Sequence, residues 1–506
     1  MAFDPKKMFV YPINNEPYPL ENPYALENVF LTKKAEGFDL PKYDEIKDQL
    51  PAPVWDGRED VIACYNRAWE IAFSNLRHAN EESRFVSDFI DCAFFTFSFM
   101  WDSCFIVMFG KYAGHIFNFQ KTLDNFYSHQ HKDGYISRQL FQSVNGERFA
   151  KDDPASTGPN ILPLAEWEYY CITKDTERLK QVFPPLLAYH KWLQLNRTWQ
   201  SGGYWTCGLA CGMDNQPRVP KEYSPLRSHG FMTWLDTCAQ QYLSGDILIK
   251  IAKIIDREDD TQWLKEEQQF LKALINEQMW DEKTAFYYDM LRDGSLNGVK
   301  SIGAYWTMLA GITPKDRADA FVAHLDNEKE FKRPFRIPSL SADHPDYYEK
   351  GDYWRGSVWA PTNYMVLKAL DKYGYNDLAY DIATNYLENV VSVFNKDGTI
   401  YENYAPEHIE RGSHSKDEFV GWTGLAPINI LFEYVFGIRP DAENKKIVWH
   451  INRLEKHGVK NYPLGDYLVD LMCEARNSPD ERPVVTVSGD SDITVEVVWK
   501  DETFKI

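Results

Sequence analysis

Apolar side chains recur every three or four residues through most of the chain, which is the spacing of one face of an α-helix. The stretch EDVIACYNRAWEIAFSNL, for example, carries them at Val61, Tyr65, Ala68, Trp69, Ala72 and Leu76. The same periodicity returns in SCFIVMFGKYA, in LKQVFPPLLAYHKWLQLN, in SVWAPTNYMVLKALDKYG and in further segments up to GLAPINILFEYVFG. The pattern predicts about twelve helices.

The predicted helices alternate with loops, several of which are long and rich in glycine or aromatic residues. No β-α-β pattern lies between them, so the expected fold class is all-α. About six helix pairs joined by long loops on one side favour an (α/α)6 toroid barrel with a central cleft over residues 58–439. An α-solenoid is the alternative, but it requires a repeat of fixed period, which the sequence lacks.

Both ends of the chain differ from this body. Residues 1–57 contain eight prolines and little periodicity, which predicts an extended arm that wraps over the helices. Residues 440–506 contain short β-branched segments separated by turn residues, such as KKIVWHI, PVVTVSG and ITVEVVWK. They predict a small antiparallel β appendage, too small for a separate catalytic domain.

Charge and composition restrict the partners. The 506 residues carry a formal net charge of −20, so nucleic acid and anionic membrane surfaces are not expected partners. The opening MAFDPKKMFVYPINN lacks the apolar stretch of a signal peptide, and no run approaches the roughly 20 apolar residues of a membrane span. A cytoplasmic location and no membrane association are therefore expected, while the oligomeric state stays open.

Metal and cofactor signals are weak. The eight cysteines show no framework spacing and are expected to be reduced thiols. Cys207 and Cys211 lie four residues apart, but no second Cys or His pair with zinc-like spacing accompanies them. No metal and no cofactor are expected.

Aromatic residues make up 15% of the chain. A large helical core accounts for most of them. Many others stand beside polar residues in loops, as in YWTCG, DYWRG, YENYAP and VGWTG. Flat apolar faces next to hydrogen-bonding groups suit a sugar ring, so a carbohydrate is the expected ligand.

One acid occupies an unusual loop. The stretch GLACGMDNQPRVP, residues 208–220, places Asp214 among glycines and prolines that disfavour regular structure. Such an acid is either a turn-stabilising Asx residue or a chemical group presented to a ligand. Hydrolysis of a glycosidic bond usually takes two carboxyl groups. The second candidate is Glu402 in TIYENYAPEH, which alone could equally be a surface residue.

Further loops add polar and aromatic candidates. FMWDSCF carries Trp101 and Asp102 just ahead of a predicted helix, where Asp102 could instead be an N-cap. DGYISR carries Arg138, and VGWTG carries Trp422. The loop-to-helix junction DYWRGSVWAPTNY adds Tyr353, Trp354, Arg355 and Trp359.

Taken in order, these stretches resemble the inverting (α/α)6-barrel glycoside hydrolases, the clan of trehalases, processing α-glucosidase I and mannosylglycerate hydrolases (glycoside hydrolase family 63-like). MWDS is similar to the trehalase YWDS, GMDNQPR to the E-S-G-x-D-N-S-P-R acid loop, and GWTG to the trehalase GWTNG. YWRGSVW is similar to the YWRGPVW of the α-glucosidase I group, which leans away from true trehalases. The resemblance covers residues 95–435.

The resemblance implies an inverting, exo-acting α-glycosidase that hydrolyses terminal α-linked glucose from an oligosaccharide or small glucoside. Asp214 would be the general acid and Glu402 the general base. An acid in a nonpolar glycine-rich loop can keep its proton near neutral pH, while a more solvated Glu402 would stay ionised. By the same resemblance, substrate contacts are expected from Trp101, Asp102, Arg138, Asn215, Arg218, Tyr353, Trp354, Arg355, Trp359 and Trp422, with Asn215 and Arg218 shaping the acid loop.

Departures from the family pattern leave the substrate open. Ala210 and Cys211 stand where the family loop has Glu and Ser, and the DGYISR turn lacks the family proline. A mannosylglycerate or glucosylglycerate hydrolase is the first alternative, and it would need a basic pocket for the glycerate carboxylate. From other classes, an (α/α)6 epimerase would need a pair of histidines that the loops lack, and a non-catalytic glycan-binding protein would not require both carboxyl groups.

Overall fold

The structure is a computed structural model that describes residues 21–35, 37, 39–489, 492–500 and 502–506. Each segment with helical periodicity contains helix, so the body is mainly helical, as predicted. Residues 1–20 of the expected arm lie outside the described residues.

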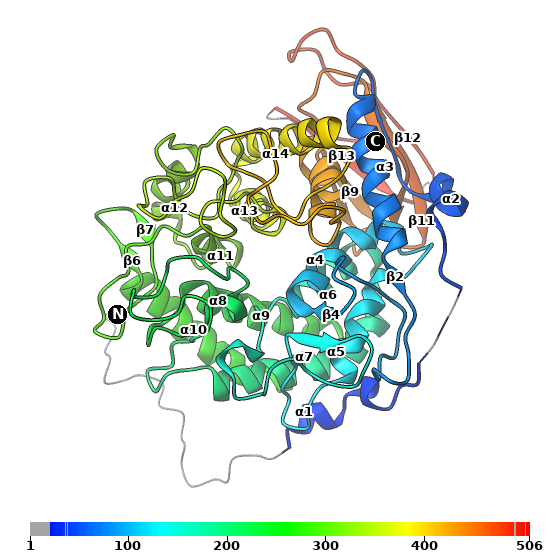
Figure 1. Cartoon of the computed structure of the whole chain (residues 1–506). Helices are drawn as coiled ribbons and strands as arrows, with labels where there is room; N and C mark the ends of the chain where they lie inside the picture. The colour runs from blue at the N-terminus through cyan, green and yellow to red at the C-terminus, as the bar shows by residue number, and fades with distance from the viewer. Residues whose placement is uncertain (1–20, 36, 38, 490–491, 501) are drawn as a thin grey trace.

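Six helical segments contact one another in cyclic order, each touching the next and the last touching the first. In chain order they are α4 (Met100–Gly110), α6 (Leu162–Thr173), α9 (Leu235–Ile254), η8 with α11 (Ile302–Tyr305 and Trp306–Leu309), α13 (Ala360–Tyr373), and η10 with the π-helical η11 (Thr423–Leu425 and Ala426–Val435). Figure 1 shows α4, α6, α9, α11 and α13 around the middle of the molecule.

A second set of helices lies toward the edge of the molecule (Figure 1). It comprises α3 (Glu59–Ser74), η5 with α5 (Phe119–Leu123 and Asp124–Ser128), α7 (Thr176–Asn196), α10 (Gln262–Gln278), α12 with η9 (Lys315–Val322 and Ala323–Asp326), and α14 (Asn376–Asp397). Sequence pattern separates the two sets: α4 buries every residue, whereas α10 buries one apolar stripe and exposes the rest. A helix that is apolar all round has to be enclosed by others.

A buried charge network joins four elements of the helical body. The Lys111 ammonium lies 3.1 Å from both Glu168 of α6 and Glu433 of η11, and Lys368 of α13 lies 2.7 Å from Glu168. Tyr364 donates a hydrogen bond of 2.7 Å to Glu433. Although burial raises the pKa of Glu168, the Lys368 and Lys111 ammonium groups lower it to about 2. The network therefore holds two buried carboxyl groups between helices that are distant in sequence.

The β region consists of two four-stranded sheets. In one, β1 (Ala52–Trp55) pairs with β10 (His457–Leu464), followed by β11 (Tyr467–Cys473) and β12 (Val485–Ser488). The other has the order β14 (Glu502–Lys505), β13 (Thr494–Trp499), β9 (Lys446–His450) and β8 (Ile438–Asp441).

Two expectations about the chain ends are corrected. The appendage is not purely antiparallel, because β13 and β9 run parallel. It is also not purely C-terminal, since β1 comes from the segment expected to be an extended arm and pairs with β10 from Ala52 to Trp55. Strand partners more than 400 residues apart leave no local signal in the sequence.

The arm also contains short elements where only extended chain was expected: α1 (Pro23–Leu26), η2 (Val29–Leu31), α2 (Tyr43–Ile46) and η3 (Lys47–Gln49). Within the helical body, three two-stranded ribbons occur between helices: β2 with β3 (Leu76–Arg77 and Phe89–Ile90), β4 with β5 (Phe97–Phe99 and Gln139–Phe141), and β6 with β7 (Trp280–Asp281 and Phe286–Tyr287).

In the described part of the chain, none of the helices has the length and apolar character that a membrane span requires.

Replacing Lys111 with Met should destabilise the protein strongly. The substitution leaves the buried Glu433 carboxylate without its nearest cation, and breaking a buried ion pair from one side costs about 3–5 kcal/mol. Urea unfolding followed by circular dichroism should show a clearly lower midpoint for Lys111→Met. Lys180→Met, which removes a solvent-exposed pair with Glu177, is the control and should keep the wild-type midpoint. Equal midpoints for all three proteins would contradict a structural role for the network.

Candidate active site

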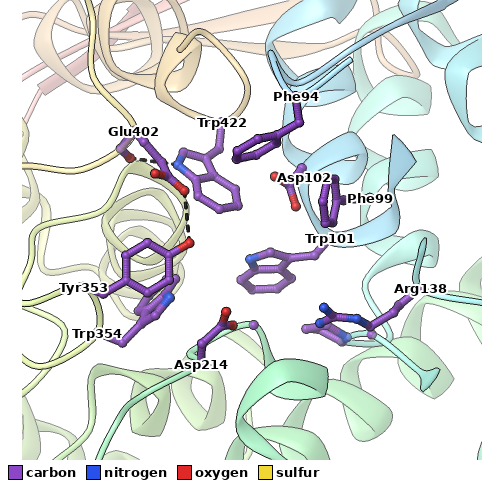
Figure 2. A pocket seen from close by; sticks show the side chains of 13 residues that line it. Phe94, Phe99, Trp101, Asp102, Arg138, Asp214, Tyr353, Trp354, Glu402 and Trp422 are labelled. Atoms are coloured by element: carbon purple, nitrogen blue, oxygen red, sulfur yellow. Dashed lines mark hydrogen bonds between the residues drawn. The ribbon is translucent and has the colours of Figure 1, made fainter. Parts of the chain in front are cut away.

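The loops before the central helices enclose a cavity of about 160 Å³ (Figure 2). This is below the roughly 300–1,000 Å³ of drug-sized ligand sites, so the cavity suits one small ring rather than a chain. It is lined by Phe94, Phe99, Trp101, Asp102, Arg138, Gly158, Pro159, Gly212, Asp214, Tyr353, Trp354, Glu402 and Trp422.

Asp214 reaches the cavity from a tightly packed loop. The loop starts with the single helical turn α8 (Gly208–Cys211), a correction to the expectation that this stretch would not be helical. A side chain at Gly208 would lie 2.1 Å from the Asp214 carbonyl oxygen. Gly212 has a φ of +78° and packs against the ring of Trp101. The glycines are therefore needed so that the loop can fold back on itself and bring Asp214 beside Trp101.

Glu402 enters from the loop that follows α14 and is fixed by several hydrogen bonds. Its carboxylate accepts from the Tyr353 hydroxyl at 3.1 Å and from the backbone N–H of Lys416 at 3.2 Å. Its backbone carbonyl accepts from the indole N–H of Trp422 at 2.9 Å. Figure 2 shows Glu402 and Asp214 reaching the cavity from different sides. The two carboxyl groups thus come from different loops.

Both carboxyl groups have raised pKa values. Burial raises the pKa of Asp214 to about 6, and the Arg138 guanidinium limits the rise. Burial raises the pKa of Glu402 to about 7, against the hydrogen bonds from Lys416 and Tyr353. The expectation that Glu402 would be the more solvated group is wrong: it is only 4% exposed, whereas Asp214 is half-buried. The contacts that bury Glu402 come from loops distant in the sequence.

Asp102 adds a third carboxyl group to the cavity. It lies in the first turn of α4, whose N-cap is Phe99, so the alternative that Asp102 is the N-cap is wrong. Burial, together with the charges of Glu402 and Asp214, holds the pKa of Asp102 well above its usual range. Arg138 is the one cation among the described residues that line the cavity.

Two donors in the cavity wall lack a partner in the described part of the chain. They are the indole N–H of Trp101 and the Nε–H of Arg138, both buried without a hydrogen-bond acceptor. Neither atom has appreciable accessible surface, so both donors are packed inside the cavity wall and do not face the open space of the cavity.

Asn215 connects the acid loop to the loop that carries Tyr353. Its side chain donates to the carbonyl of Asp352 at 2.9 Å and accepts from the backbone N–H of Trp354 at 2.8 Å. Between these contacts Tyr353 has a φ of +64°, a conformation that is costly for a bulky side chain. The clamp on either side therefore holds Tyr353 where its hydroxyl meets Glu402.

Aromatic stacking supports the same wall. The rings of Trp354 and Trp359 stack with centroids 4.0 Å apart, and Trp422 meets Trp359 edge-on at 5.5 Å. The indole N–H of Trp359 donates to the carbonyl of Tyr353 at 3.3 Å. Trp359 thus packs behind the wall.

Six of the ten expected substrate contacts line the cavity: Trp101, Asp102, Arg138, Tyr353, Trp354 and Trp422. The structure does not bring the other four to it. Asn215 bonds to the backbone on either side of Tyr353, and Trp359 stacks behind Trp354. Arg355 turns to Asp352 at 2.9 Å and to the carbonyl of Asp346 at 3.1 Å.

Arg218 is enclosed away from the cavity. Its guanidinium donates to Asp289 at 2.8 and 2.6 Å and to Asp236 at 3.0 Å. The expected sugar contact is therefore wrong, whereas the expected role of Arg218 in shaping the acid loop agrees with these ion pairs. Its two partners could not be predicted, because both acids lie in other segments.

Sequence reasoning missed Phe94 and Phe99, together with Gly158, Pro159 and Gly212. The signal for the first two was the phenylalanine-rich AFFTFSF run. The Asp91 carboxylate accepts backbone N–H groups of Ala93 and Phe95, which both have positive φ, and the resulting turn directs Phe94 to the rim.

A helical body that encloses a sugar-sized, aromatic-lined cavity with two carboxyl groups is the arrangement of a glycoside hydrolase. A family model described as "Mannosylglycerate hydrolase MGH1-like glycoside hydrolase domain" matches residues 96–423. The chain therefore belongs to the MGH1-like glycoside hydrolases.

Relatives with different substrates in their names match this chain about equally. A mannosylglycerate hydrolase of Thermus thermophilus is 25% identical over 360 residues, which covers 56% of this chain and 84% of that protein. A probable mannosyl-oligosaccharide glucosidase of Schizosaccharomyces pombe is 23% identical over 335 residues, which covers 59% of this chain and 40% of that protein. The chain thus spans less than half of the yeast relative.

The fold is similar to that of a GH63 mannosylglycerate hydrolase from Thermus thermophilus, solved in complex with Tris and D-glycerate. The TM-score is 0.59 at 21% identity, over 72% of this chain and 99% of that one.

Replacing Tyr353 with Phe should raise the pKa of Glu402 above its value of about 7, because the variant removes a hydrogen bond that favours the ionised form. One hydrogen bond to a charged group corresponds to a rise of about one pKa unit. The pKa of Glu402 is measured from the pH dependence of its carboxyl band in the infrared spectrum. The band that is missing in Glu402→Gln identifies this group. Tyr347→Phe, which loses a bond to the remote Glu407, is the control. If the pKa of Glu402 is the same in Tyr353→Phe as in the wild type, the hydrogen bond between the two side chains is contradicted.

Proposed function

We propose that the chain is an inverting, exo-acting α-glycosidase that removes a terminal α-linked glucose from an oligosaccharide or small glucoside. The observation that carries the proposal is the pair of carboxyl groups with raised pKa values, Asp214 and Glu402, on different sides of one small cavity. Both titrate close to neutral pH, where a general acid and a general base are most effective.

In the proposed mechanism Asp214 gives its proton to the glycosidic oxygen, and the bond from that oxygen to the anomeric carbon breaks. Glu402 takes a proton from a water molecule whose oxygen bonds to the opposite face of the anomeric carbon. The leaving group departs as an alcohol, and an α-glycoside gives a β-sugar. The two carboxyl groups should lie roughly 6.5–9.5 Å apart to admit that water.

The order of the two pKa values requires an effect of the substrate. In the free protein the single shared proton favours Glu402, since its pKa is the higher one. A sugar ring over the half-buried Asp214 would displace water from it and raise its pKa further. Substrate binding would thereby move the proton to the acid that needs it.

The remaining cavity residues would bind the sugar to be released. The guanidinium of Arg138 would donate to its hydroxyl groups, and Asp102 would accept or donate according to its protonation. The faces of Trp422 and Phe94 would cover its apolar side. A volume of about 160 Å³ supports release of one terminal ring at a time.

The same proposal includes an (α/α)6 toroid as the architecture of the helical body. The cyclic contacts of α4, α6, α9, α11, α13 and η10, with a second helix set outside them, support it. A cytoplasmic location also belongs to the proposal. The eight cysteines are free, which suits a reducing compartment.

A mannosylglycerate or glucosylglycerate hydrolase is the second candidate, and one cluster of arginines favours it. The guanidinium groups of Arg138, Arg148 and Arg227 lie 5.2, 5.6 and 6.0 Å from the ring centroid of Phe149. Phe149 packs with Cys207 and Ala210 of the acid loop. A leaving group near Asp214 would therefore meet positive charge, as a glycerate carboxylate requires.

Hydrolysis of a panel of α-linked substrates separates the two candidates. If the chain is an α-glucosidase, the wild type should release glucose from kojibiose or nigerose. If it is a mannosylglycerate or glucosylglycerate hydrolase, it should release a free hexose from one of those two compounds. Asp214→Asn and Glu402→Gln should each lose at least about a hundredfold in kcat, because each removes one half of the acid and base pair. Full activity in either variant would contradict its assigned role, and inactivity of the wild type on the whole panel would oppose both candidates.

The kcat/KM of the wild type should be bell-shaped in pH, with limbs near 6 and 7. Below the lower limb both carboxyl groups are protonated and no base is left, while above the upper limb both are ionised and no acid is left. The apparent values belong to the coupled pair. A profile that stays flat from pH 5 to pH 9 would contradict acid and base catalysis by these two groups.

A further inference from the structure

A cluster of aromatic rings lies outside the catalytic cavity. It consists of Trp199, Trp205, Tyr223, His229 and Phe231, and is called the aromatic platform below. None of the five lines the cavity, which takes its residues from other segments. Catalysis as proposed above makes no use of them.

The rings of the platform contact one another through His229. The His229 ring lies 5.0 Å from Trp199, 5.3 Å from Trp205 and 4.6 Å from Phe231. Trp199 and Phe231 stack with planes 20° apart, and Tyr223 meets Phe231 at 5.6 Å. The five rings therefore form one continuous surface.

Phe231 is exposed to solvent and has a strained backbone conformation. It is 42% exposed and has a φ of +51°, a conformation that disfavours bulky side chains. Its backbone N–H donates to Nδ1 of His229 at 3.0 Å, and the indole N–H of Trp199 donates to the carbonyl of Met232 at 2.9 Å. Strained backbone that the surrounding structure fixes in place is typical of binding sites.

Two N–H donors on the platform are open to a ligand. Because Nδ1 of His229 accepts a hydrogen bond, the proton of the neutral ring is on Nε2. Among the described residues, neither His229 Nε2 nor the indole N–H of Trp205 has a hydrogen-bond acceptor, and neither is among the buried unpartnered groups. Both are therefore accessible. Flat apolar faces bordered by uncharged donors match the apolar face and the hydroxyl rim of a sugar.

The platform is fixed relative to the acid. The segment between Tyr223 and Phe231 pairs with the acid loop, because the N–H of Gly208 donates to the carbonyl of Pro225 at 3.1 Å and the N–H of Leu209 to that of Leu226 at 3.0 Å. Two backbone hydrogen bonds thus connect the platform to the turn that positions Asp214.

We propose that the aromatic platform is a second saccharide-binding site, which takes a neutral α-linked oligosaccharide outside the catalytic cavity. The cavity has room for one ring, so the remaining rings of a chain have to lie elsewhere on the surface. The His229 and Trp205 donors suit sugar hydroxyl groups, since burial lowers the pKa of His229. Two arginines border the rings, with Arg292 5.7 Å from the centroid of Phe231 and Arg197 4.8 Å from that of Trp205, and their guanidinium groups can also donate to hydroxyl groups. The inference rests on the exposed Phe231, the half-buried rings packed beside it and their accessible donors, not on which sugar the cavity cleaves.

Fluorine NMR of the Asp214→Asn protein labelled with 5-fluorotryptophan tests this proposal. The Trp205 signal is assigned with Trp205→Phe, and those of Trp101 and Trp422 in the cavity with the matching substitutions. Titration with maltoheptaose and with α-1,2-mannotetraose should shift the Trp205 signal for at least one sugar. Phe231→Ala should weaken this binding at least about tenfold. Phe95→Ala is the control and should not weaken it: Phe95 is 50% exposed, against 42% for Phe231, and also lies beside an arginine, Arg77.

The outcomes separate this proposal from the proposed function. Shifts of Trp205 without shifts of Trp101 and Trp422 support the platform even if the cavity binds neither sugar. Shifts confined to the cavity tryptophans, or none for either sugar, overturn the platform. Hydrolysis of a small aryl α-glycoside by Phe231→Ala should equal that of the wild type, because the platform lies outside the cavity.

Discussion

The site depends on two carboxyl groups, Asp214 and Glu402, that can each be protonated or ionised near neutral pH. In the proposed reaction one of them has to carry a proton while the other is ionised. Burial alone would keep both carboxyl groups protonated, because it penalises the ionised form. The Tyr353 hydroxyl and the Lys416 N–H limit that effect for Glu402, and the Arg138 guanidinium limits it for Asp214. As a result both carboxyl groups titrate near neutral pH, where one proton can move from one carboxyl group to the other.

Much of the packing around the cavity serves that balance. Asn215 joins the acid loop to the strained backbone at Tyr353, and the stacked rings of Trp354 and Trp359 support the same segment. Arg218 anchors the acid loop to Asp236 and Asp289. Loss of one of these contacts would therefore change the pKa of a carboxyl group as well as the stability of a loop.

The helical body could be predicted because its signal is local. Apolar residues at helical spacing, as in α3, are recognised from positions only three or four residues apart. The pairing of β1 with β10 was missed because it joins opposite ends of the sequence, and the parallel pair of β9 and β13 was missed because strand direction depends on the connection between them.

For the site, ordered motifs indicated both carboxyl groups and most of the wall, since each motif is short. The solvation of Glu402 and the position of Arg218 depend on partners from distant segments, which no motif contains. Phe94 was missed because only the Asp91 turn shows where its ring points.

The stereochemistry of the first product tests the central claim most directly. Proton NMR during the first minutes of hydrolysis, before the anomers interconvert, identifies the anomer released from an α-linked substrate. The account predicts the β-sugar, because Glu402 activates water on the face opposite the leaving group. Initial release of the α-sugar would show a covalent intermediate with retention, and would contradict the role of Glu402 as a general base.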